Sequence, residues 1–252
     1  MPSLQPVWIA VGAWLCYQLT GPPPPGSRFE RLQRRLGGGD AAVTLHYFDV
    51  RGRGEAVRLA LEDLGVAYAD AAFTGEQWRG GLKDAWTRDG RVAFGQVPRL
   101  DVDGLHLVQS HSILRYLARR EGAYAGFTNA RLARIDIAAD GTEDVRKQLT
   151  AIKYDADATD DEKRARFAAW FAEKQATWFG YFERLFSPGS HYVAGTRDPT
   201  HADYLLFDLV DTCASVGAPP SFLDAFPNIQ NMRNALADRP RVAAYLATRR
   251  KA

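Results

Sequence analysis

The spacing of apolar residues in the first half of the chain predicts a strand followed by a helix. Residues 43–48, VTLHYF, have the β-branched and aromatic composition of a short strand. Val57, Leu61 and Leu64 then recur at helical spacing within EAVRLALEDL. Gly65 follows directly, where a glycine commonly ends a helix. We therefore expect a β-α unit here.

The next segments complete a small mixed module. Residues 67–73 predict a second strand, and a polar loop containing tryptophan follows it. The stretch QVPRLDVDGLHLV alternates apolar residues around Asp103 and Gly104, which favour a type I′ hairpin turn. SHSILRYLARR then predicts a helix that stops at Gly122. The order β-α-β followed by β-β-α is that of a thioredoxin-like domain, which we place at residues 42–122.

From residue 128 onward the pattern predicts helices alone. Long stretches carry Leu, Ile, Phe and Trp at spacings of three and four residues, without strand alternation. Thr200 and Asp203 form a capping box before the apolar run YLLFDLV, so we expect them to start a buried helix and to do no chemistry. The predicted fold class is α/β plus all-α, with a thioredoxin-like N-terminal domain followed by a helical-bundle domain at residues 128–252.

Residues 1–41 differ from the rest and are interpreted as a poorly ordered leader and linker. Residues 7–19 form an uncharged, mostly apolar run that is too short as a helix for the roughly 30 Å hydrocarbon core of a bilayer. A signal-peptide core or a short anchor fits this length better, but no Lys or Arg precedes the run and no clear cleavage site follows it. Membrane contact is therefore expected only through residues 7–19, and targeting by the leader stays open.

Charge and cysteine usage exclude several classes of protein. The formal net charge of +2 comes from the leader, so the rest of the chain is formally neutral and no nucleic-acid binding is expected. The two cysteines, Cys16 and Cys213, exclude a disulfide framework and favour a reducing, cytoplasmic location. Cys213 stands in an apolar stretch and is interpreted as a packing residue. The sequence has no histidine spacing typical of a metal site and no phosphate-binding glycine motif.

The segment after the first strand carries the first candidate chemistry. A thioredoxin-like module can attack with its own cysteine at this place, or it can bind the thiol of another molecule there. The residues are Tyr47-Phe48-Asp49-Val50-Arg51-Gly52-Arg53, and the missing cysteine excludes disulfide exchange by this module. A phenol can donate a hydrogen bond to a sulfur anion, which makes Tyr47 a candidate donor.

Four motifs, in this order, resemble the cytosolic glutathione transferases. They are YFDVRGRGEAVRLAL, QVPRL, QSHSILRYLAR and THADYLLFDL, and the resemblance spans residues 43–246, about four-fifths of the chain. Short pieces such as QVP are common by chance, but four pieces in order on the expected elements are specific. The first motif is similar to that of the tyrosine-dependent group, nearest to the sigma and pi classes. The resemblance implies a homodimeric enzyme that uses glutathione as a co-substrate and has no tightly bound cofactor.

The resemblance gives catalytic roles to Tyr47 and Arg53. Free thiols ionise near pKa 8.5, and lowering this value by about two units requires roughly 2.7 kcal/mol of thiolate stabilisation. Tyr47 would donate its O–H to the glutathione thiolate, and Arg53 would add positive field nearby. Two other interpretations stay open: Tyr47 as an ordinary strand tyrosine, and Arg53 as the structural partner of an acid.

Further residues are implied to bind glutathione. Pro98 resembles the family's cis-proline, which leaves the Val97 main chain free to pair with the cysteinyl part of glutathione. Ser110, at a helix start, would receive the γ-glutamyl carboxylate, a role that is compatible with Ser110 being a plain N-cap serine. Asp144 matches an acid that reaches across the dimer to the γ-glutamyl amine. The full expected set is Trp78, Lys83, Gln96, Val97, Pro98, Gln109, Ser110 and Asp144, with Trp78 and Lys83 near the glycine carboxylate.

The second substrate is expected to be a small hydrophobic electrophile, because it must meet a thiolate in a partly dry cleft. Phe48, Val50 and Tyr154 are its predicted walls, and Tyr154 matches a tyrosine that helps to bind or polarise electrophiles in pi-like relatives. His111 stands where the family often has another small or polar residue, which is a departure at the rim.

Three acids of the second domain share one predicted helical face. They are Asp140, Glu143 and Asp144, spaced three and four residues apart. We interpret them as a solvated acidic face and expect no metal, although a divalent cation at the subunit boundary is the open alternative.

The predicted function is glutathione S-conjugation, in which the thiolate attacks an electrophilic carbon or a peroxide oxygen without a covalent enzyme intermediate. Two alternatives stay open. One is a prostaglandin-type isomerase, which would use the same Tyr47. The other is a non-catalytic ligand carrier that kept the architecture and lost turnover.

Overall fold

A computed structural model describes residues 43–124 and 126–250 of the chain. The predicted leader at residues 1–41, its apolar run at 7–19 and Cys16 lie outside these residues. Within the described part of the chain, no helix combines the length and the apolar character needed to cross a membrane.

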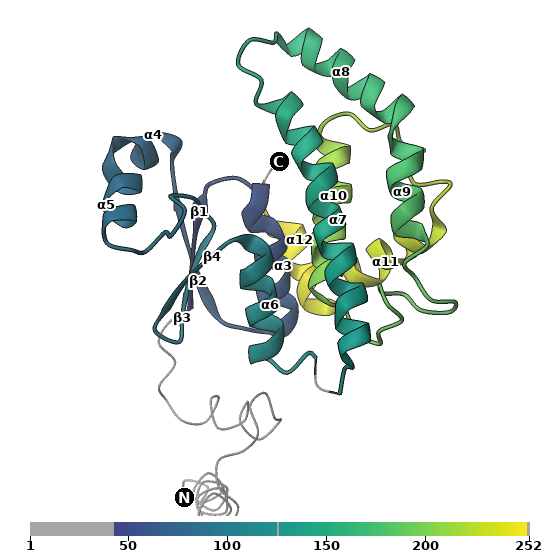
Figure 1. The fold of residues 1–252 in the computed structure, drawn as a ribbon, viewed down its shortest axis with the longest axis horizontal. Coiled ribbons are helices and arrows are strands. Elements are labelled where there is room, and N and C mark those ends of the chain that lie inside the picture. The colour runs from purple at the N-terminus through teal and green to yellow at the C-terminus, as the bar shows by residue number, and fades with distance from the viewer. Residues whose placement is uncertain (1–42, 125, 251–252) are drawn as a thin grey trace, which may run out of the picture.

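A four-stranded mixed sheet forms the first half of the described chain (Figure 1). Its strands are β1 (Val43–Phe48), β2 (Tyr68–Phe73), β3 (Arg99–Val102) and β4 (Leu105–Val108), in the spatial order β2-β1-β3-β4. β1 pairs in parallel with β2 and antiparallel with β3, and β3 and β4 form an antiparallel hairpin. Asp103 and Gly104 connect this hairpin with φ values of 51° and 77°, as the type I′ prediction requires.

Two helices, α3 (Glu55–Leu64) and α6 (Ser110–Arg120), lie on one face of the sheet (Figure 1). α3 follows a short helical turn, η1 (Gly52–Gly54), and ends at Gly65 in the left-handed conformation (φ 68°), as predicted. The apolar residues of both helices and the inward side chains of β1 and β3 belong to one core cluster. The thioredoxin-like prediction for this half is confirmed.

The segment between β2 and β3 is folded, so the prediction of a polar loop was wrong there. It contains α4 (Gly75–Gln77), a π-helical turn η2 (Trp78–Leu82) and α5 (Lys83–Arg88). Phe73, Trp86 and Val92 are buried together, and Phe48 and Trp78 pack against them. This second apolar cluster holds the short helices in place. Its aromatic residues are too irregularly spaced to form a helical or strand pattern, which is why the sequence did not predict the helices.

The second half of the chain is helical, as predicted. Its helices are α7 (Asn129–Lys153), α8 (Asp160–Glu173), α9 (Gln175–Glu183), α10 (His201–Ser215), α11 (Pro227–Ala237) and α12 (Pro240–Thr248). α10 is buried along most of its length and starts with the predicted capping box, in which the Asp203 carboxylate accepts from the Thr200 backbone N–H at 2.8 Å. Cys213 on α10 is fully buried, as expected of a packing residue, and burial raises the pKa of its thiol to about 12.

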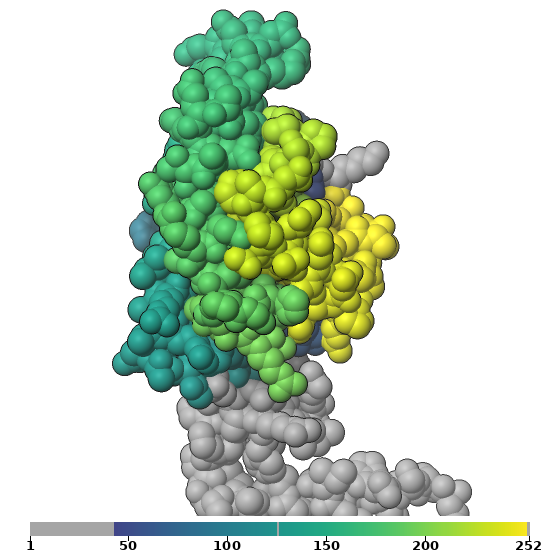
Figure 2. Space-filling model, turned by 90° about the vertical axis from the view of Figure 1, so that its right-hand side faces the viewer, coloured from purple at the N-terminus to yellow at the C-terminus, as the bar shows by residue number. Residues whose placement is uncertain are grey.

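The two halves share one apolar core, because α10 and α12 pack on α3 from the sheet domain. The segment that connects α7 to α8 projects beyond the remainder of the helical domain (Figures 1 and 2). The end of β1 and the turn η1 face α7 across the boundary between the halves, and this boundary is where the candidate site lies.

Candidate active site

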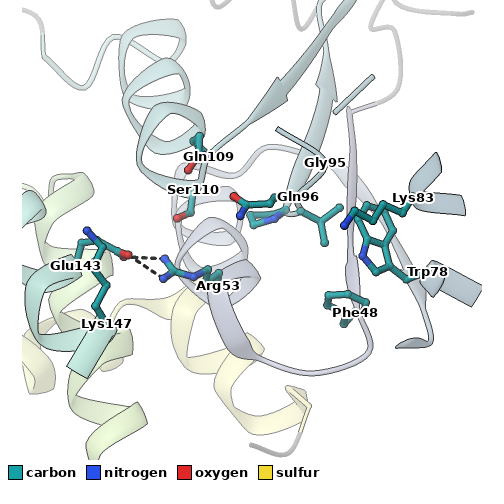
Figure 3. A pocket seen from close by; sticks show the side chains of 12 residues that line it. Phe48, Arg53, Trp78, Lys83, Gly95, Gln96, Gln109, Ser110, Glu143 and Lys147 are labelled. Atoms are coloured by element: carbon teal, nitrogen blue, oxygen red, sulfur yellow. Dashed lines mark hydrogen bonds and ion pairs between the residues drawn. The ribbon is translucent and has the colours of Figure 1, made fainter. Parts of the chain in front are cut away.

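A cavity of about 600 Å³ opens between the sheet domain and α7 (Figure 3). Residues from five separate segments line it: Phe48, Arg53, Trp78, Lys83, Gly95, Gln96, Val97, Pro98, Gln109, Ser110, Glu143 and Lys147. Seven of the eight residues expected to bind glutathione are in this lining, and Asp144 is the one that is not. Trp78 and Lys83 lie at one end of the cavity, and Gln109 and Ser110 lie beyond Gln96 toward α7.

The central wall of this cavity is the chain that leads into β3. The Val97–Pro98 peptide bond is cis, as the resemblance implied. Gln109 occupies the N-cap position of α6 with φ 70° and ψ 110°, and Ser110 is the first residue of the helix. The N-cap position therefore belongs to Gln109, one residue before the serine that was expected there. Ser110 is buried in the wall at the N-terminal end of α6, where the first backbone N–H groups of a helix have no intrahelical partner and can bind an anion.

Tyr47 is the penultimate residue of β1, and its ring is buried, with 7% of its surface exposed. Its hydroxyl oxygen accepts a hydrogen bond from the Arg53 backbone N–H at 2.9 Å. The O–H proton therefore remains available for donation to another group. Burial raises the pKa of the phenol above its ordinary value, and the Arg53 hydrogen bond opposes this only in part, so Tyr47 is protonated at neutral pH.

Two glycines of η1 leave room for the Tyr47 ring. A Cβ at Gly52 would stand 2.7 Å from the Tyr47 hydroxyl oxygen, and a Cβ at Gly54 would stand 2.7 Å from a ring carbon. Gly52 also has φ 42°, a conformation that glycine adopts more readily than other residues. The two glycines of the R-G-R-G motif thus leave the space that the Tyr47 ring occupies. This role was not predicted from the sequence.

Arg53 reaches across the boundary to α7 and pairs with Glu143. Its two terminal nitrogens donate to the two carboxylate oxygens at 2.7 and 2.8 Å (Figure 3). Burial alone would raise the pKa of Glu143, but the hydrogen bonds from Arg53 hold it below its ordinary value. The structural pairing left open for Arg53 is therefore what the structure contains. Arg53 also lines the cavity, so its charge contributes to the site after partial neutralisation.

The acidic face of α7 is only partly solvated, because the sheet domain supplies basic partners for two of its three acids. Glu143 pairs with Arg53, and Asp140 accepts from Arg115 at 3.0 Å and lies 3.4 Å from a ring nitrogen of His111. The described residues include no group of three His, Cys, Asp or Glu side chains that could hold a metal ion. Asp140 and Asp144 are nevertheless exposed, so the prediction of a solvated face holds for these two acids and fails for Glu143.

A second cavity of about 290 Å³ lies beside Tyr47. Val50 and Tyr154, two of the predicted walls for the electrophile, line it together with the Tyr47 ring. Phe48, the third predicted wall, instead lines the larger cavity near Trp78. Arg53 lines both cavities and marks their common edge.

Asp144 lies outside both cavities. It is exposed on α7 and lines an adjoining hollow of about 410 Å³, which also includes His111 and shares Ser110 with the larger cavity. Lys147 lines both this hollow and the larger cavity, and it was not among the residues expected from the sequence. Its spacing of four residues from Glu143 on one helix was the signal that could have found it.

Comparisons with known proteins agree with the geometry. The family model "Glutathione S-transferase, N-terminal domain" matches residues 43–119, and "Glutathione S-transferase, C-terminal domain" matches residues 143–249. Glutathione S-transferase P 2 of Bufo bufo is 34% identical over 209 residues, which cover 82% of this chain and 92% of that protein. Glutathione S-transferase P of Caenorhabditis elegans is 33% identical, with 82% and 93% covered.

Solved structures of related proteins superpose on this fold. The pi-class glutathione S-transferase of Onchocerca volvulus superposes with a TM-score of 0.69 at 25% identity, covering 82% of this chain and 92% of that one. Prostaglandin synthase D of Nilaparvata lugens superposes with a TM-score of 0.70 at 22% identity, covering 84% and 100%, which supports a shared fold alone.

Proposed function

The chain belongs to the glutathione S-transferase family, and from this premise we propose that it conjugates the glutathione thiolate, stabilised by Tyr47, to small electrophiles. The observation that carries the proposal is the hydrogen bonding of Tyr47. Its hydroxyl accepts from the Arg53 backbone and keeps its own proton for the sulfur. Directed donation of this kind stabilises an anion more than a neutral thiol, which lowers the thiol pKa.

The order of residues along the larger cavity supports binding of an extended tripeptide. Lys83 and Trp78 are positioned for a glycine carboxylate, and the Val97 main chain for the cysteinyl unit. Ser110 and Gln109, at the start of α6, are positioned for the γ-glutamyl carboxylate. The cysteinyl sulfur would then lie near Tyr47 and Arg53, where the second cavity begins. No further cofactor is needed for this reaction.

We propose that the working enzyme is a homodimer. Asp144 is exposed near Ser110 but outside the larger cavity of its own chain, which fits a residue that completes the partner's site. Phe94, beside the cavity wall, and Ile137, on α7, are large apolar residues that are 69% and 63% exposed. Contact with a second copy would cover them. Given the cysteine usage, we also propose a cytoplasmic location.

Turnover of 1-chloro-2,4-dinitrobenzene with glutathione tests the proposal. We expect Tyr47→Phe to lower kcat/KM by roughly 10²–10³-fold, because it removes one donor to the developing anion. The pH profile of kcat/KM should also move toward the ordinary thiol pKa of about 8.5. Ultraviolet titration of bound glutathione should show the thiolate band weaken in the same variant.

Tyr181→Phe is the matched control, since Tyr181 is half exposed on α9 and lines neither cavity. It should leave both measurements unchanged. Tight binding of glutathione without turnover of this or any other electrophile would contradict conjugation and favour the ligand carrier. Full activity in Tyr47→Phe would instead remove Tyr47 from its proposed role.

A further inference from the structure

The second cavity is more basic than the predicted apolar pocket. Tyr47, Val50 and Tyr154 supply its apolar wall, but four basic side chains also line it. These are Arg51, Arg53, Arg146 and Lys153, against the two carboxylates Asp208 and Asp211. A pocket for purely apolar electrophiles would not bring this many cations to its surface, because desolvating unpaired charge is costly.

Two of the four cations form close hydrogen-bonded ion pairs with carboxylates outside the shared Asp211 group. Arg53 is held by both oxygens of Glu143. Arg146 donates to the Asp208 carboxylate at 2.6 Å, and both of these side chains are buried. Their charges are therefore largely neutralised within the protein.

Arg51 is different, because its acid is shared. The Asp211 carboxylate lies 2.6 Å from Arg249 and 3.1 Å from Arg233, whereas Arg51 approaches it only to 3.8 Å. One carboxylate carries a single negative charge and cannot neutralise three guanidinium groups, and the longest of the three contacts belongs to the arginine that lines the cavity. Arg51 therefore retains N–H donors and positive charge for a ligand.

Lys153 supplies a second available charge. It is exposed at the C-terminal end of α7 with its ammonium 5.9 Å from the centre of the Tyr154 ring. Among residues 43–124 and 126–250, no carboxylate forms an ion pair with it. It lines the same 290 Å³ cavity as Arg51. Two cations that have no carboxylate partner of their own therefore line one small site.

We propose that the second cavity selects electrophiles that carry a carboxylate. The apolar part of such a substrate would lie against Tyr47, Val50 and Tyr154, and its carboxylate would bind Arg51 and Lys153. In such a substrate the carboxylate must be distant from the reacting carbon, because that carbon has to approach the glutathione sulfur beside Tyr47. This inference rests on the proposed function, and it specifies the substrate class that the function would act on.

A matched pair of probes isolates the carboxylate. 4-Chloro-3,5-dinitrobenzoate and its primary amide share one leaving group and nearly one shape. In each, the glutathione sulfur forms a bond to the ring carbon that bears chlorine, the carbon–chlorine bond breaks, and chloride leaves with the bonding pair. The thiol proton passes to the buffer. Dividing each kcat/KM by the uncatalysed rate constant removes the difference in intrinsic reactivity.

The corrected kcat/KM for the acid should exceed that for the amide by about tenfold or more in the unmodified protein. We expect Arg51→Gln to lower this ratio by about tenfold, since it removes charge-assisted hydrogen bonds. Lys153→Gln should lower it by about threefold, because its charge is exposed. Lys174→Gln removes one positive charge outside the cavity and should leave the ratio unchanged. A ratio near one, or a ratio that neither Arg51→Gln nor Lys153→Gln alters, overturns the inference.

A binding measurement separates this inference from the proposed function. The glutathione conjugates of the two probes can be titrated by calorimetry into the full-length protein and the same variants. The acid conjugate should bind about tenfold more tightly than the amide conjugate, and the advantage should shrink in 0.5 M salt. Absence of turnover of both probes and of 1-chloro-2,4-dinitrobenzene contradicts the proposed function alone. Equal affinity for the two conjugates contradicts the selection of carboxylates, whatever the turnover.

Discussion

Among single residues, Tyr47 depends on its neighbour Gly52 more directly than on any charged group. A methyl group at residue 52 would collide with the phenol oxygen and would also carry the strain of φ 42°. We expect Gly52→Ala to displace the hydroxyl and to lower kcat/KM at least tenfold, because a donor acts only when it is well positioned. The free energy of unfolding should fall by about 1–2 kcal/mol.

Gly104→Ala is the matched control for this prediction. Gly104 also has positive φ, 77°, but a Cβ there would meet nothing within 4 Å. The variant should lose similar stability in urea unfolding and keep its activity. If Gly52→Ala remains fully active, the steric role assigned to Gly52 is wrong.

The site residues differ in how far sequence could predict them. Tyr47 follows from the first strand and the missing cysteine, both of which are local features. The partner of Arg53 could not be predicted in this way, because Glu143 is 90 residues away and any acid of that helix face fits the pattern equally well. The cations of the second cavity were missed for the same reason. Arg51, Arg146 and Lys153 look like ordinary surface charges until the two domains are packed together.

Among secondary-structure elements, α10 depends on its buried capping box. The Asp203 carboxylate accepts from the Thr200 backbone N–H, the Thr200 hydroxyl and the Val193 backbone N–H, at 2.7 to 2.9 Å. All three residues are buried, so Asp203→Ala would leave several donors without a partner. We expect the free energy of unfolding in urea at pH 7 to fall by about 3 kcal/mol.

The equivalent box at the start of α8 provides the comparison. Glu162 makes the same reciprocal bonds with Thr159, but on the protein surface. Glu162→Ala should therefore lower the free energy of unfolding by clearly less than Asp203→Ala does, because water replaces the lost acceptor. An equal decrease in the free energy of unfolding in the two variants would show that burial does not determine how much a capping box contributes to stability.

Elements with regular periodicity were predictable, and elements formed by tertiary packing were not. The strand at residues 43–48, the Asp103–Gly104 hairpin and the box at Thr200 each have a local cause. The short helices between β2 and β3 form around Trp86, whose partner Phe73 comes from a strand. No local signal distinguishes that arrangement from a loop.

At the scale of the whole molecule, polar side chains connect the two domains around a common core. The Asp63 carboxylate at the end of α3 accepts from the Tyr204 hydroxyl of α10 at 2.6 Å, and it also pairs with Arg239. Glu55 at the start of α3 accepts from Tyr245 of α12 at 2.9 Å. Because the cavities lie along this boundary, the geometry of the site depends on the two domains remaining docked.

His201, at the first turn of α10, should make the molecule sensitive to acid. Its Nδ1 is hydrogen-bonded with the Tyr124 hydroxyl, its Nε2 lies 3.3 Å from the Asp136 carboxylate, and burial lowers its pKa from 6.5 to about 4. The folded protein thus binds this proton less readily than the unfolded chain does. The stabilising contribution is complete above about pH 6.5 and is lost as the pH falls toward 4, by about 2 to 3 kcal/mol.

Comparison of His201→Gln with the unmodified protein isolates this contribution from that of other groups. Burial raises the pKa of Asp203 and of Asp208 to about 6, so both carboxyls act in the opposite direction over part of this interval. Urea unfolding between pH 7 and pH 4.5 should give a smaller loss of stability in His201→Gln, whatever its stability at pH 7. His191→Gln, which changes an exposed histidine, should keep the original slope. If the slope of His201→Gln matches that of the unmodified protein, His201 is not the acid-sensitive group over this interval. Pairs such as Asp101 with His46 and Arg99, where hydrogen bonds hold the pKa of the carboxyl low despite its partial burial, lose their contribution only below about pH 4 and therefore do not disturb this comparison.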